Sequence, residues 1–570
     1  MTIAWRKHLL RVALVLAVAV HLPALSSPLL FDDYAQAAMA EGRFVGARSP
    51  LDFYDYIDAA NRDDLLASGN LPWWSDRQLT VRFLRPLASA LRWADYRVFG
   101  HRVVWHHVHS LLWWGLAVAG VHALLRRSFE RRAAFLGTAV FSVAVCHATP
   151  LAWLADRVAL VSPALGTFAL LSYLRWRDER RPRDALASLA LFSLAFLAGE
   201  YATCLGGYVV ATELARRREP LGRRALGVLP FALPAAAYLW VHLALRYGAH
   251  GAGFYRDPLS DVFAYAQGVP RRLAVLLGVA WLGVEDAWFY APAWKLALLA
   301  VACGVVAIPV VRVVRGLGED SRAPAAIMLV GSLLSLAPVL AVDSAARVLG
   351  IPMIGVSAVV GLVLDRAWFP PSPVPRRGFA ELTGLVALAL GFVHLVRAPL
   401  DTVLVSRGLA VAGQRYKGRI AWVREHVGAA VSTVYVLRAD SPESLLWGGL
   451  ALDEDPPPRL RVLSFASGRS LLLRTGPRSL ELAAGSRPLV PVGPDDLFRR
   501  AGELKVGDVV RVPGMNVTIL KTDEEDCPSR LRFDLDEDFD SPSVRWITDG
   551  ETGYRVERPP EVGFGAPLMP

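Results

Sequence analysis

A series of long apolar runs fills the first 400 residues of this chain and then stops. The runs are about 14 to 22 residues long, near the roughly 20 residues with which an α-helix crosses a hydrocarbon core. Hydrophobic residues make up 54% of the whole chain, and its mean hydropathy is +0.35. The pattern predicts an α-helical polytopic membrane protein with a smaller, water-exposed C-terminal domain.

Arginines gather in short segments between the apolar runs, at 126–132, 175–183 and 216–224. Such clusters are typical of cytoplasmic loops. The net charge of +10 would by itself also suit nucleic-acid binding, but this distribution predicts no nucleic-acid partner. We expect an inner (cell) membrane protein with a cytoplasmic N-terminus, an uncleaved first span and a periplasmic C-terminal domain.

The runs predict about eleven transmembrane helices in a domain covering 1–400. A large outer loop at 26–102 follows the first span, and an apolar piece at 273–283 is too short to cross comfortably. We expect a linker helix at 401–430 and a β-rich periplasmic domain at 431–570. The expected spans are 9–25, 103–125, 133–148, 158–174, 185–198, 201–214, 226–245, 293–311, 325–342, 349–364 and 382–395, and the expected strands are 431–437, 459–463, 470–473, 509–512 and 517–520.

Two adjacent carboxylates, Asp32 and Asp33, directly follow the first apolar run. Carboxylates at a membrane surface are costly unless they are hydrated, paired or used in chemistry. They also suit the first turn of a helix, where a carboxylate caps free backbone N–H groups. A partly desolvated carboxylate at this depth is a candidate base for an acceptor hydroxyl, because desolvation raises its basicity.

Cationic side chains on the predicted outer side are candidates to neutralise a phosphate leaving group, which arginine binds with two parallel hydrogen bonds. Glu200, at the tip of a predicted helical hairpin, is a candidate to face the acids or one of the cations. The alternative for each arginine is snorkelling or pairing with a nearby carboxylate, and Asp156 is the obvious neighbour of Arg157. The candidate arginines are Arg85, Arg157, Arg256 and Arg347.

Two other polar clusters favour a structural interpretation. The histidines at 101, 106, 107 and 109 have no nearby carboxylate at a zinc-site spacing, so we interpret them as core or interfacial residues. The acidic run at 534–540 lacks the glycine and terminal glutamate of an EF-hand loop, so we interpret it as a solvated turn.

Five groups of residues recur in order along the membrane domain. They are Phe31-Asp32-Asp33-Tyr34; Arg85-Pro86-Leu87 with Asp95, Phe99-Gly100 and His106; His147, Pro150, Trp153 and Arg157; Gly199-Glu200; and Arg347 to Pro352. With these motifs the chain resembles the GT-C class of integral-membrane glycosyltransferases. The resemblance is nearest to the protein O-mannosyltransferase-like group and its bacterial relatives, and it covers roughly 9–364.

The resemblance implies an inverting transfer of a sugar, outside the cytoplasm, from a polyprenyl-phosphate donor to an acceptor hydroxyl of a protein or glycan of the cell envelope. It implies Asp32 as the base and Asp33 as its polar partner. It also implies that Arg85, Arg157, Glu200 and Arg347 bind or shape the donor. It requires no metal, although some relatives use a divalent ion.

Two other functions stay open: a transporter or flippase of a lipid-linked molecule, and a non-catalytic membrane scaffold with this fold. A transporter often shows inverted repeats and broken spans near the membrane midplane. The charged residues here gather instead at one predicted face, which favours catalysis at the interface.

Overall fold

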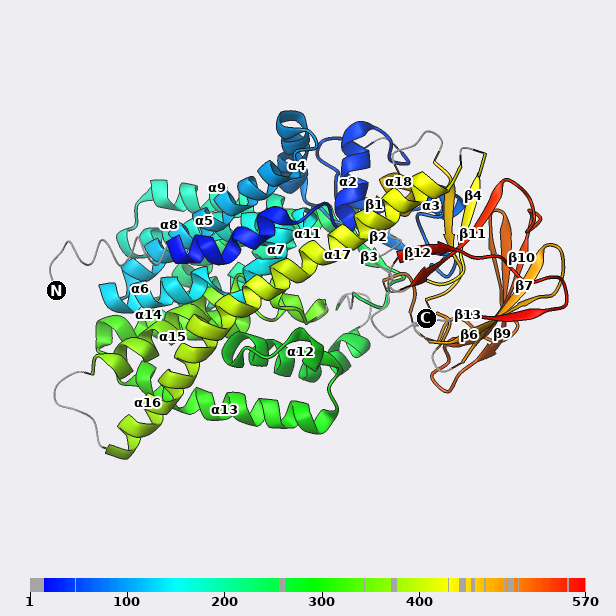
Figure 1. The fold of residues 1–570 in the computed structure, drawn as a ribbon. Coiled ribbons are helices and arrows are strands. Elements are labelled where there is room, and N and C mark those ends of the chain that lie inside the picture. The colour runs from blue at the N-terminus through cyan, green and yellow to red at the C-terminus, as the bar shows by residue number, and fades with distance from the viewer. Residues whose placement is uncertain are drawn as a thin grey trace. The chain divides into compact units, whose positions relative to one another are not determined.

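The computed structural model describes residues 15–46, 48–255, 258, 262–342, 344–370, 377–428, 430–439, 447–452, 457–465, 468–485, 488–490, 497–500, 502–550 and 553–568. The chain forms two compact units (Figure 1). Unit 1 comprises 1–27, 84–246 and 256–410, and unit 2 comprises 28–83, 247–255 and 411–570. Each unit is described by itself.

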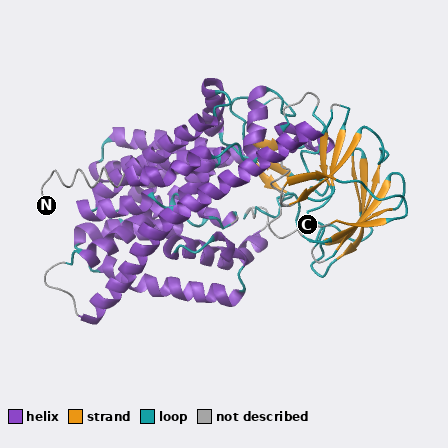
Figure 2. Ribbon diagram, in the orientation of Figure 1, coloured by secondary structure: helices purple, strands orange, loops and turns teal. Residues whose placement is uncertain are grey.

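Unit 1 is helical (Figure 2). The helix bounds follow the apolar runs because a backbone without water must satisfy its polar groups internally. Its α-helices are α4 (Pro86–Phe99), α5 (Val103–Ser128), α6 (Arg131–Ser142), α7 (Ala148–Ala152), α8 (Val158–Glu179), α9 (Pro182–Ala198), α10 (Gly206–Ala215), α11 (Leu221–Ala244), α12 (Val262–Leu282), α13 (Ala293–Arg315), α14 (Glu319–Leu334), α15 (Pro352–Trp368), α16 (Arg377–Phe392) and the first part of α17 (Ala398–His426).

Short helical turns connect these elements. They are η1 (Leu22–Ser26), η2 (Val145–His147), η3 (Leu154–Arg157), η4 (Glu200–Leu205), η5 (Asp286–Tyr290), η6 (Pro338–Ala341), η7 (Ala346–Leu349) and the π-helical turn η8 (Val393–Arg397).

Six helices in the described part of the chain are long and apolar enough to cross a membrane, or seven if the bent pair Arg131–Ser142 and Val145–Ala152 is one span. The multi-pass membrane character is therefore confirmed, but the count of about eleven is not. The predicted spans at 185–198, 201–214 and 349–364 correspond to α9, α10 and α15, with 17, 10 and 17 residues. The first predicted span is described from Val15 onward.

Two segments are longer helices than the sequence suggested. The apolar piece at 273–283 is the second half of α12, a helix of 21 residues. The last predicted span and the predicted linker helix join, through η8, into one 46-residue helix, Glu381–His426. The residues after Ala398 are more polar, so the apolar run ends there. The helix continues because these residues still favour the helical backbone.

The centre of unit 1 is α15, whose residues from Pro352 to Asp365 are all buried. Glycines let its neighbours approach closely: a Cβ on Gly361 would lie 2.5 Å from the backbone nitrogen of Gly137, and one on Gly355 would lie 2.1 Å from the Met328 carbonyl oxygen. Close backbone approach at small residues is a main source of packing between membrane helices. At the periphery, only 17% of the apolar window of α11 is buried within the protein.

Unit 2 holds the described strands in three sheets (Figure 2). The six-stranded sheet is antiparallel in the order β13-β6-β7-β10-β9-β8, and in the four-stranded sheet β12-β11-β4-β5 the last three strands are parallel. The elements are β1 (Asp55–Ile57), β2 (Thr80–Arg82), β3 (Gly248–His250), β4 (Thr433–Val436), β5 (Arg459–Val462), β6 (Ser470–Arg474), β7 (Ser479–Ala484), β8 (Val509–Val512), β9 (Met515–Thr522), β10 (Pro528–Leu535), β11 (Val544–Gly550), β12 (Gly553–Val556), β13 (Gly565–Leu568), α2 (Asp32–Glu41), α3 (Arg62–Ser68), α18 (Gly448–Ala451) and the end of α17.

The β-rich C-terminal region is confirmed, and all five predicted strands are found there. Residues 28–83 of the first outer loop belong to the same unit, because α2 contacts α18 and α3 contacts β5. In this loop, β2 pairs with β1 and also with β3 from the segment at 247–255. Gly69, at φ +81°, lies so close to the edge of β5 that a Cβ would be 2.3 Å from the Leu460 carbonyl oxygen. This close fit fixes the loop helix α3 against the four-stranded sheet.

Candidate active site

The predicted site residues are divided between the two units. Asp32 and Asp33 belong to unit 2, while Arg85, Arg157, Glu200 and Arg347 belong to unit 1. Arg256 lies outside the described residues.

The acidic pair opens helix α2. Phe31, immediately before it, has φ +42°, a left-handed conformation that is unfavourable for a bulky residue and is found where the surroundings impose it. This turn places both carboxylates in the first turn of α2, where the exposed N–H groups favour negative charge. Both acids therefore sit at a helix start, but the N-cap residue is Phe31, and its side chain makes no capping hydrogen bond.

The two carboxylates have different surroundings. Asp33 is 0% exposed, and its Oδ2 accepts a hydrogen bond of 3.0 Å from the Leu30 backbone N–H. Asp32 is half-buried, and its Oδ1 accepts a hydrogen bond of 3.1 Å from the indole N–H of Trp447. Asp33 therefore orders the segment that enters the helix, while Asp32 is held in one orientation and keeps solvent access.

Sequence reasoning missed Trp447, which lies 415 residues after Asp32. Its buried ring packs at 5.8 Å from Phe44 and 6.1 Å from Tyr56. The Tyr56 hydroxyl in turn accepts a hydrogen bond of 2.8 Å from Gln36 on α2. No local pattern around Trp447 indicates this role, because only the tertiary fold brings the C-terminal region to the first loop.

In unit 1, Arg85 and Glu200 form a two-point ion pair. Arg85 Nε donates to Glu200 Oε2 at 2.9 Å, and a second guanidinium N–H donates to Oε1. Although burial raises the pKa of Glu200, the adjacent Arg85 guanidinium holds it below its ordinary value. The tip of the helical hairpin thus carries a carboxylate that faces one of the candidate arginines, Arg85.

Arg347 lies over the Trp153 ring at 5.3 Å, and its Nη1 is 3.9 Å from Asp156 Oδ1. Asp156 is also within electrostatic range of Arg85 and Glu200. Three of the four predicted substrate-binding residues therefore gather around Asp156. The Arg347 side chain is 23% exposed, so its guanidinium has access to solvent.

Arg157 is more enclosed than Arg347. Its guanidinium pairs with Asp95, donates to Ser110 Oγ at 2.8 Å and donates to the His106 carbonyl oxygen at 2.7 Å. Its ion-pair partner is thus 62 residues away, whereas the adjacent Asp156 lies near Arg347. These bonds fit a buried residue that supports the site without binding the ligand itself.

Asp95 is the acceptor that holds this buried network together. It also bonds His109 Nδ1 at 2.6 Å. Burial raises the pKa of Asp95, but the hydrogen bond with His109 and the charges of Arg157 and Arg92 outweigh burial and hold the pKa at about 2. The carboxylate therefore stays charged at any physiological pH.

The neighbouring histidines bond to the backbone. His106 Nε2 lies 2.9 Å from the Gly100 carbonyl oxygen, and His107 Nε2 lies 2.9 Å from the Ser27 carbonyl oxygen. Both rings are fully buried. These contacts match the interpretation of the histidines as core residues.

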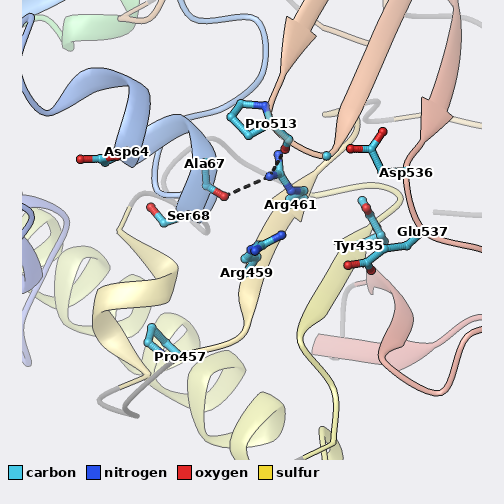
Figure 3. A pocket seen from close by; sticks show the side chains of 11 residues that line it. Asp64, Ala67, Ser68, Tyr435, Pro457, Arg459, Arg461, Pro513, Asp536 and Glu537 are labelled. Carbon is cyan, nitrogen blue, oxygen red and sulfur yellow. Dashed lines mark hydrogen bonds between the residues drawn. The ribbon is translucent and has the colours of Figure 1, made fainter.

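Unit 2 also contains a polar pocket of about 530 Å³ (Figure 3). The acidic run at 534–540 contributes to it: Asp536 and Glu537 line the pocket, while Asp534 accepts a hydrogen bond from Ser479 and Asp540 pairs with Arg474. Two residues of the predicted solvated turn therefore face a cavity, which the sequence did not indicate.

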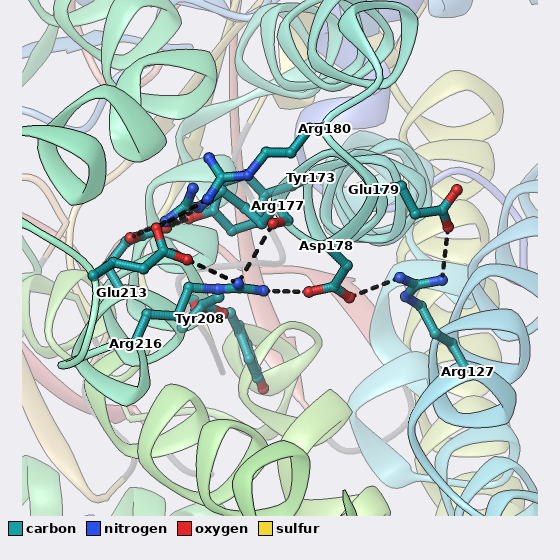
Figure 4. Close-up of polar contacts among 11 residues, drawn as sticks. Arg127, Tyr173, Arg177, Asp178, Glu179, Arg180, Tyr208, Glu213 and Arg216 are labelled. Atoms are coloured by element: carbon teal, nitrogen blue, oxygen red, sulfur yellow. Dashed lines mark hydrogen bonds and ion pairs between the residues drawn. The ribbon is translucent and has the colours of Figure 1, made fainter.

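A second charged network, the Arg177 network, joins α5, α8 and α10 in unit 1 (Figure 4). Arg177 Nε donates to Glu213 Oε1 at 2.6 Å, and its Nη2 donates to Glu219 at 2.9 Å. Asp178 pairs with both Arg216 and Arg127. The arginine clusters that the sequence assigned to cytoplasmic loops thus bind acids from neighbouring helix ends.

Comparison with known proteins gave matches among solved structures alone. No family model matches the chain, and no curated protein matches it. ArnT from Cupriavidus metallidurans bound to undecaprenyl phosphate is similar, with 15% identity, a TM-score of 0.41, and coverage of 81% of this chain and 86% of that one. The oligosaccharyltransferase of Archaeoglobus fulgidus in its apo form is similar, with 12% identity, a TM-score of 0.44, and coverage of 81% and 64%.

Both matched proteins are of the class that the sequence motifs resemble, the GT-C membrane glycosyltransferases. The nearer likeness to protein O-mannosyltransferases has no counterpart among these matches. With TM-scores below 0.5, the matches carry no argument about activity, which rests on the residues themselves.

Proposed function

We propose that this chain is a membrane glycosyltransferase that moves a sugar from a polyprenyl-phosphate donor to an acceptor hydroxyl on the extracytoplasmic side. Asp32 is the base in this proposal. The chain lies in the cell membrane with a cytoplasmic N-terminus and a periplasmic unit 2. The lipid-phosphate-linked sugar is the donor substrate, and the motifs imply no metal.

The observation that carries the proposal is the division of labour within the acidic pair. A general base must be oriented and must also reach its substrate. Asp32 meets both conditions, because the Trp447 indole N–H holds one of its oxygens while the side chain stays half-exposed. Asp33, fully buried and bonded to the Leu30 N–H, supports the turn that presents Asp32.

The transfer balances as a single displacement. Asp32 accepts the proton of the acceptor hydroxyl as its oxygen bonds to the anomeric carbon. The bond from that carbon to the phosphate oxygen breaks, and the polyprenyl phosphate leaves with the electron pair. Attack opposite the leaving group inverts the anomeric centre.

The developing charge on the phosphate needs a fixed cation. We assign this role to Arg347, which combines solvent access with an orientation set by Trp153 and Asp156. Arg85 with Glu200 shapes the same site, and Arg157 supports it from the buried side. The placement of this cationic group opposite Asp32 remains a prediction.

The test replaces Asp32 with asparagine in cells that depend on this chain. Incorporation of a labelled sugar into envelope material is measured beside the amount of protein in the membrane. Asp32→Asn should lower incorporation by about 10² to 10⁴, the usual contribution of a general base. Asp63→Asn is the matched control, because Asp63 is an exposed acid of the same loop.

Normal incorporation by Asp32→Asn at normal protein levels would refute the assignment of the base. Loss of export of a lipid-linked sugar, with sugar transfer intact in opened membranes, would favour a flippase instead.

A further inference from the structure

The polar pocket of unit 2 is enclosed by segments far apart in the chain. Its walls come from α3, the strands β4 and β5, the turn between β8 and β9, and the acidic residues after β10. A volume of about 530 Å³ lies within the range of small-molecule sites, roughly 300 to 1,000 Å³. Its lining residues are Asp64, Ala67, Ser68, Tyr435, Pro457, Arg459, Arg461, Pro513, Gly514, Asp536 and Glu537.

The two arginines of the pocket differ in what they bind. They are two residues apart on β5 and so share one face of the strand. Arg461 is 4% exposed. It donates to the Ala67 carbonyl oxygen at 3.0 Å and also to the Pro513 carbonyl oxygen, so it stabilises the wall of the pocket. Arg459 is exposed and has no ion pair or side-chain hydrogen bond within the described part of the chain. Its five N–H donors are available to a ligand.

The opposite wall offers acceptors. Asp536 and Glu537 stand across from Arg459 in the close-up view (Figure 3). Glu537 Oε2 is buried, yet it has no hydrogen-bond partner among the described residues. A buried acceptor without a donor destabilises the protein, and a ligand hydroxyl that donates to it would remove this cost.

The charges of the pocket restrict the ligand. The lining carries both signs of charge: an anion meets the like charges of Asp64, Asp536 and Glu537, and a cation meets those of Arg459 and Arg461. A neutral sugar avoids both penalties, because each hydroxyl donates to a carboxylate and accepts from a guanidinium. We infer that the pocket formed by α3, β5 and the Asp536–Glu537 segment binds a neutral saccharide.

This inference deepens the proposed function and rests on it, in that the saccharide is the acceptor of the transferred sugar. Helix α18 packs against both α2, which carries Asp32, and β5, which carries Arg459. The pocket and the base therefore belong to one packed unit, and the acceptor predicted here is a glycan.

The experiment measures binding of the full-length purified protein to an array of neutral, anionic and cationic glycans, with a peptide array beside it and no donor present. Wild-type protein should bind neutral glycans and neither charged class. Arg459→Ala should weaken that binding at least tenfold, Glu537→Gln should weaken it severalfold, and Arg459→Lys should fall between wild type and Arg459→Ala. Arg469→Ala is the matched control, because Arg469 is an exposed arginine of unit 2 outside the pocket.

Binding of anionic glycans or peptides in place of neutral glycans would overturn the inference, as would the absence of any glycan binding. Thermal unfolding of each variant separates a lost site from a lost fold. Asp32→Asn separates this inference from the proposed function, because it should keep glycan binding while losing transfer. If Asp32→Asn keeps transfer, the assignment of Asp32 as the base fails, whether or not the pocket binds glycans.

Discussion

Two charged clusters of unit 1 use the same chemistry in different surroundings. In the Arg177 network, the Arg177 side chain is 0% exposed and is bonded to two glutamates. In the cluster around Asp156, Arg347 is 23% exposed and lies 3.9 Å from its acid. A closed, short-range network suits the joining of helices, whereas an arginine with solvent access suits a ligand.

Packing explains the difference. A Cβ on Gly227 of α11 would lie 2.7 Å from Glu213 Oε1, so the backbone of α11 closes over the Arg177 network. Arg347 instead lies against the flat face of Trp153, which orients the guanidinium and leaves its edge accessible. Solvent access, more than charge, therefore separates the candidate ligand site from the structural ion pairs in unit 1.

The largest expected effect comes from opening the Arg177 network. Glu213→Ala should lower the free energy of unfolding by about 3 to 5 kcal/mol, because it leaves a buried guanidinium without its main partner. Thermal unfolding in detergent measures the loss. The double variant Arg177→Met/Glu213→Leu should recover most of it, and a double variant as unstable as the single one would contradict the explanation.

Arg347 should show the opposite behaviour. Arg347→Ala should lower sugar transfer by about 10² to 10³ with little change in thermal unfolding, since the side chain stabilises charge that develops only during the reaction. Arg347→Lys should retain part of the activity, because an ammonium group keeps the charge but loses the two-point geometry. Unchanged transfer by Arg347→Ala would remove Arg347 from the proposed site.

Acid should destabilise the buried network around Asp95. The pKa of Asp95 is lowered to about 2, so its contribution is full above the unfolded value near 4 and is lost as the pH falls from about 4 to 2. The shift corresponds to about 2 kcal/mol. Unfolding temperatures measured between pH 2 and 6 should fall less steeply for Asp95→Asn than for wild type, and parallel curves would argue against this role.

The smallest effect is expected at the rim of the Arg177 network. Arg127 pairs with Asp178 at 2.7 Å, but both side chains are partly exposed. Arg127→Ala should therefore change the free energy of unfolding by about 0.2 to 1 kcal/mol and leave transfer unchanged. It also serves as the control for Arg347→Ala. A loss of transfer in Arg127→Ala would contradict the assignment of the Arg177 network to structure and of the cluster around Asp156 to ligand binding.

Several local features were predictable from the sequence. The apolar runs became helices, and the alternating segments at 470–473 and 517–520 became strands β6 and β9. The acidic pair was found at a helix start, as the capping rule suggests. These features depend on neighbours within a few residues, so a local pattern contains the needed information.

The partners of the site residues were not predictable. Arg157 was expected beside Asp156 and pairs with Asp95, and Asp32 takes its hydrogen bond from Trp447. Proximity in sequence is a poor guide here, because helical geometry points adjacent side chains in different directions. The count of about eleven spans is not confirmed, because three of the predicted spans correspond to helices of 17, 10 and 17 residues.

The amino-acid sequence by itself determined that this chain enters a membrane, where most of its apolar helices lie, and which acids and arginines are available for chemistry. It did so because hydrophobic length and local hydrogen bonding act over short stretches of chain. Only the tertiary structure decided that Asp33 is buried while Asp32 is half-buried, and that Arg157 is enclosed while Arg347 is partly exposed. Burial depends on residues that are distant in sequence, so it is settled only when the helices and strands pack.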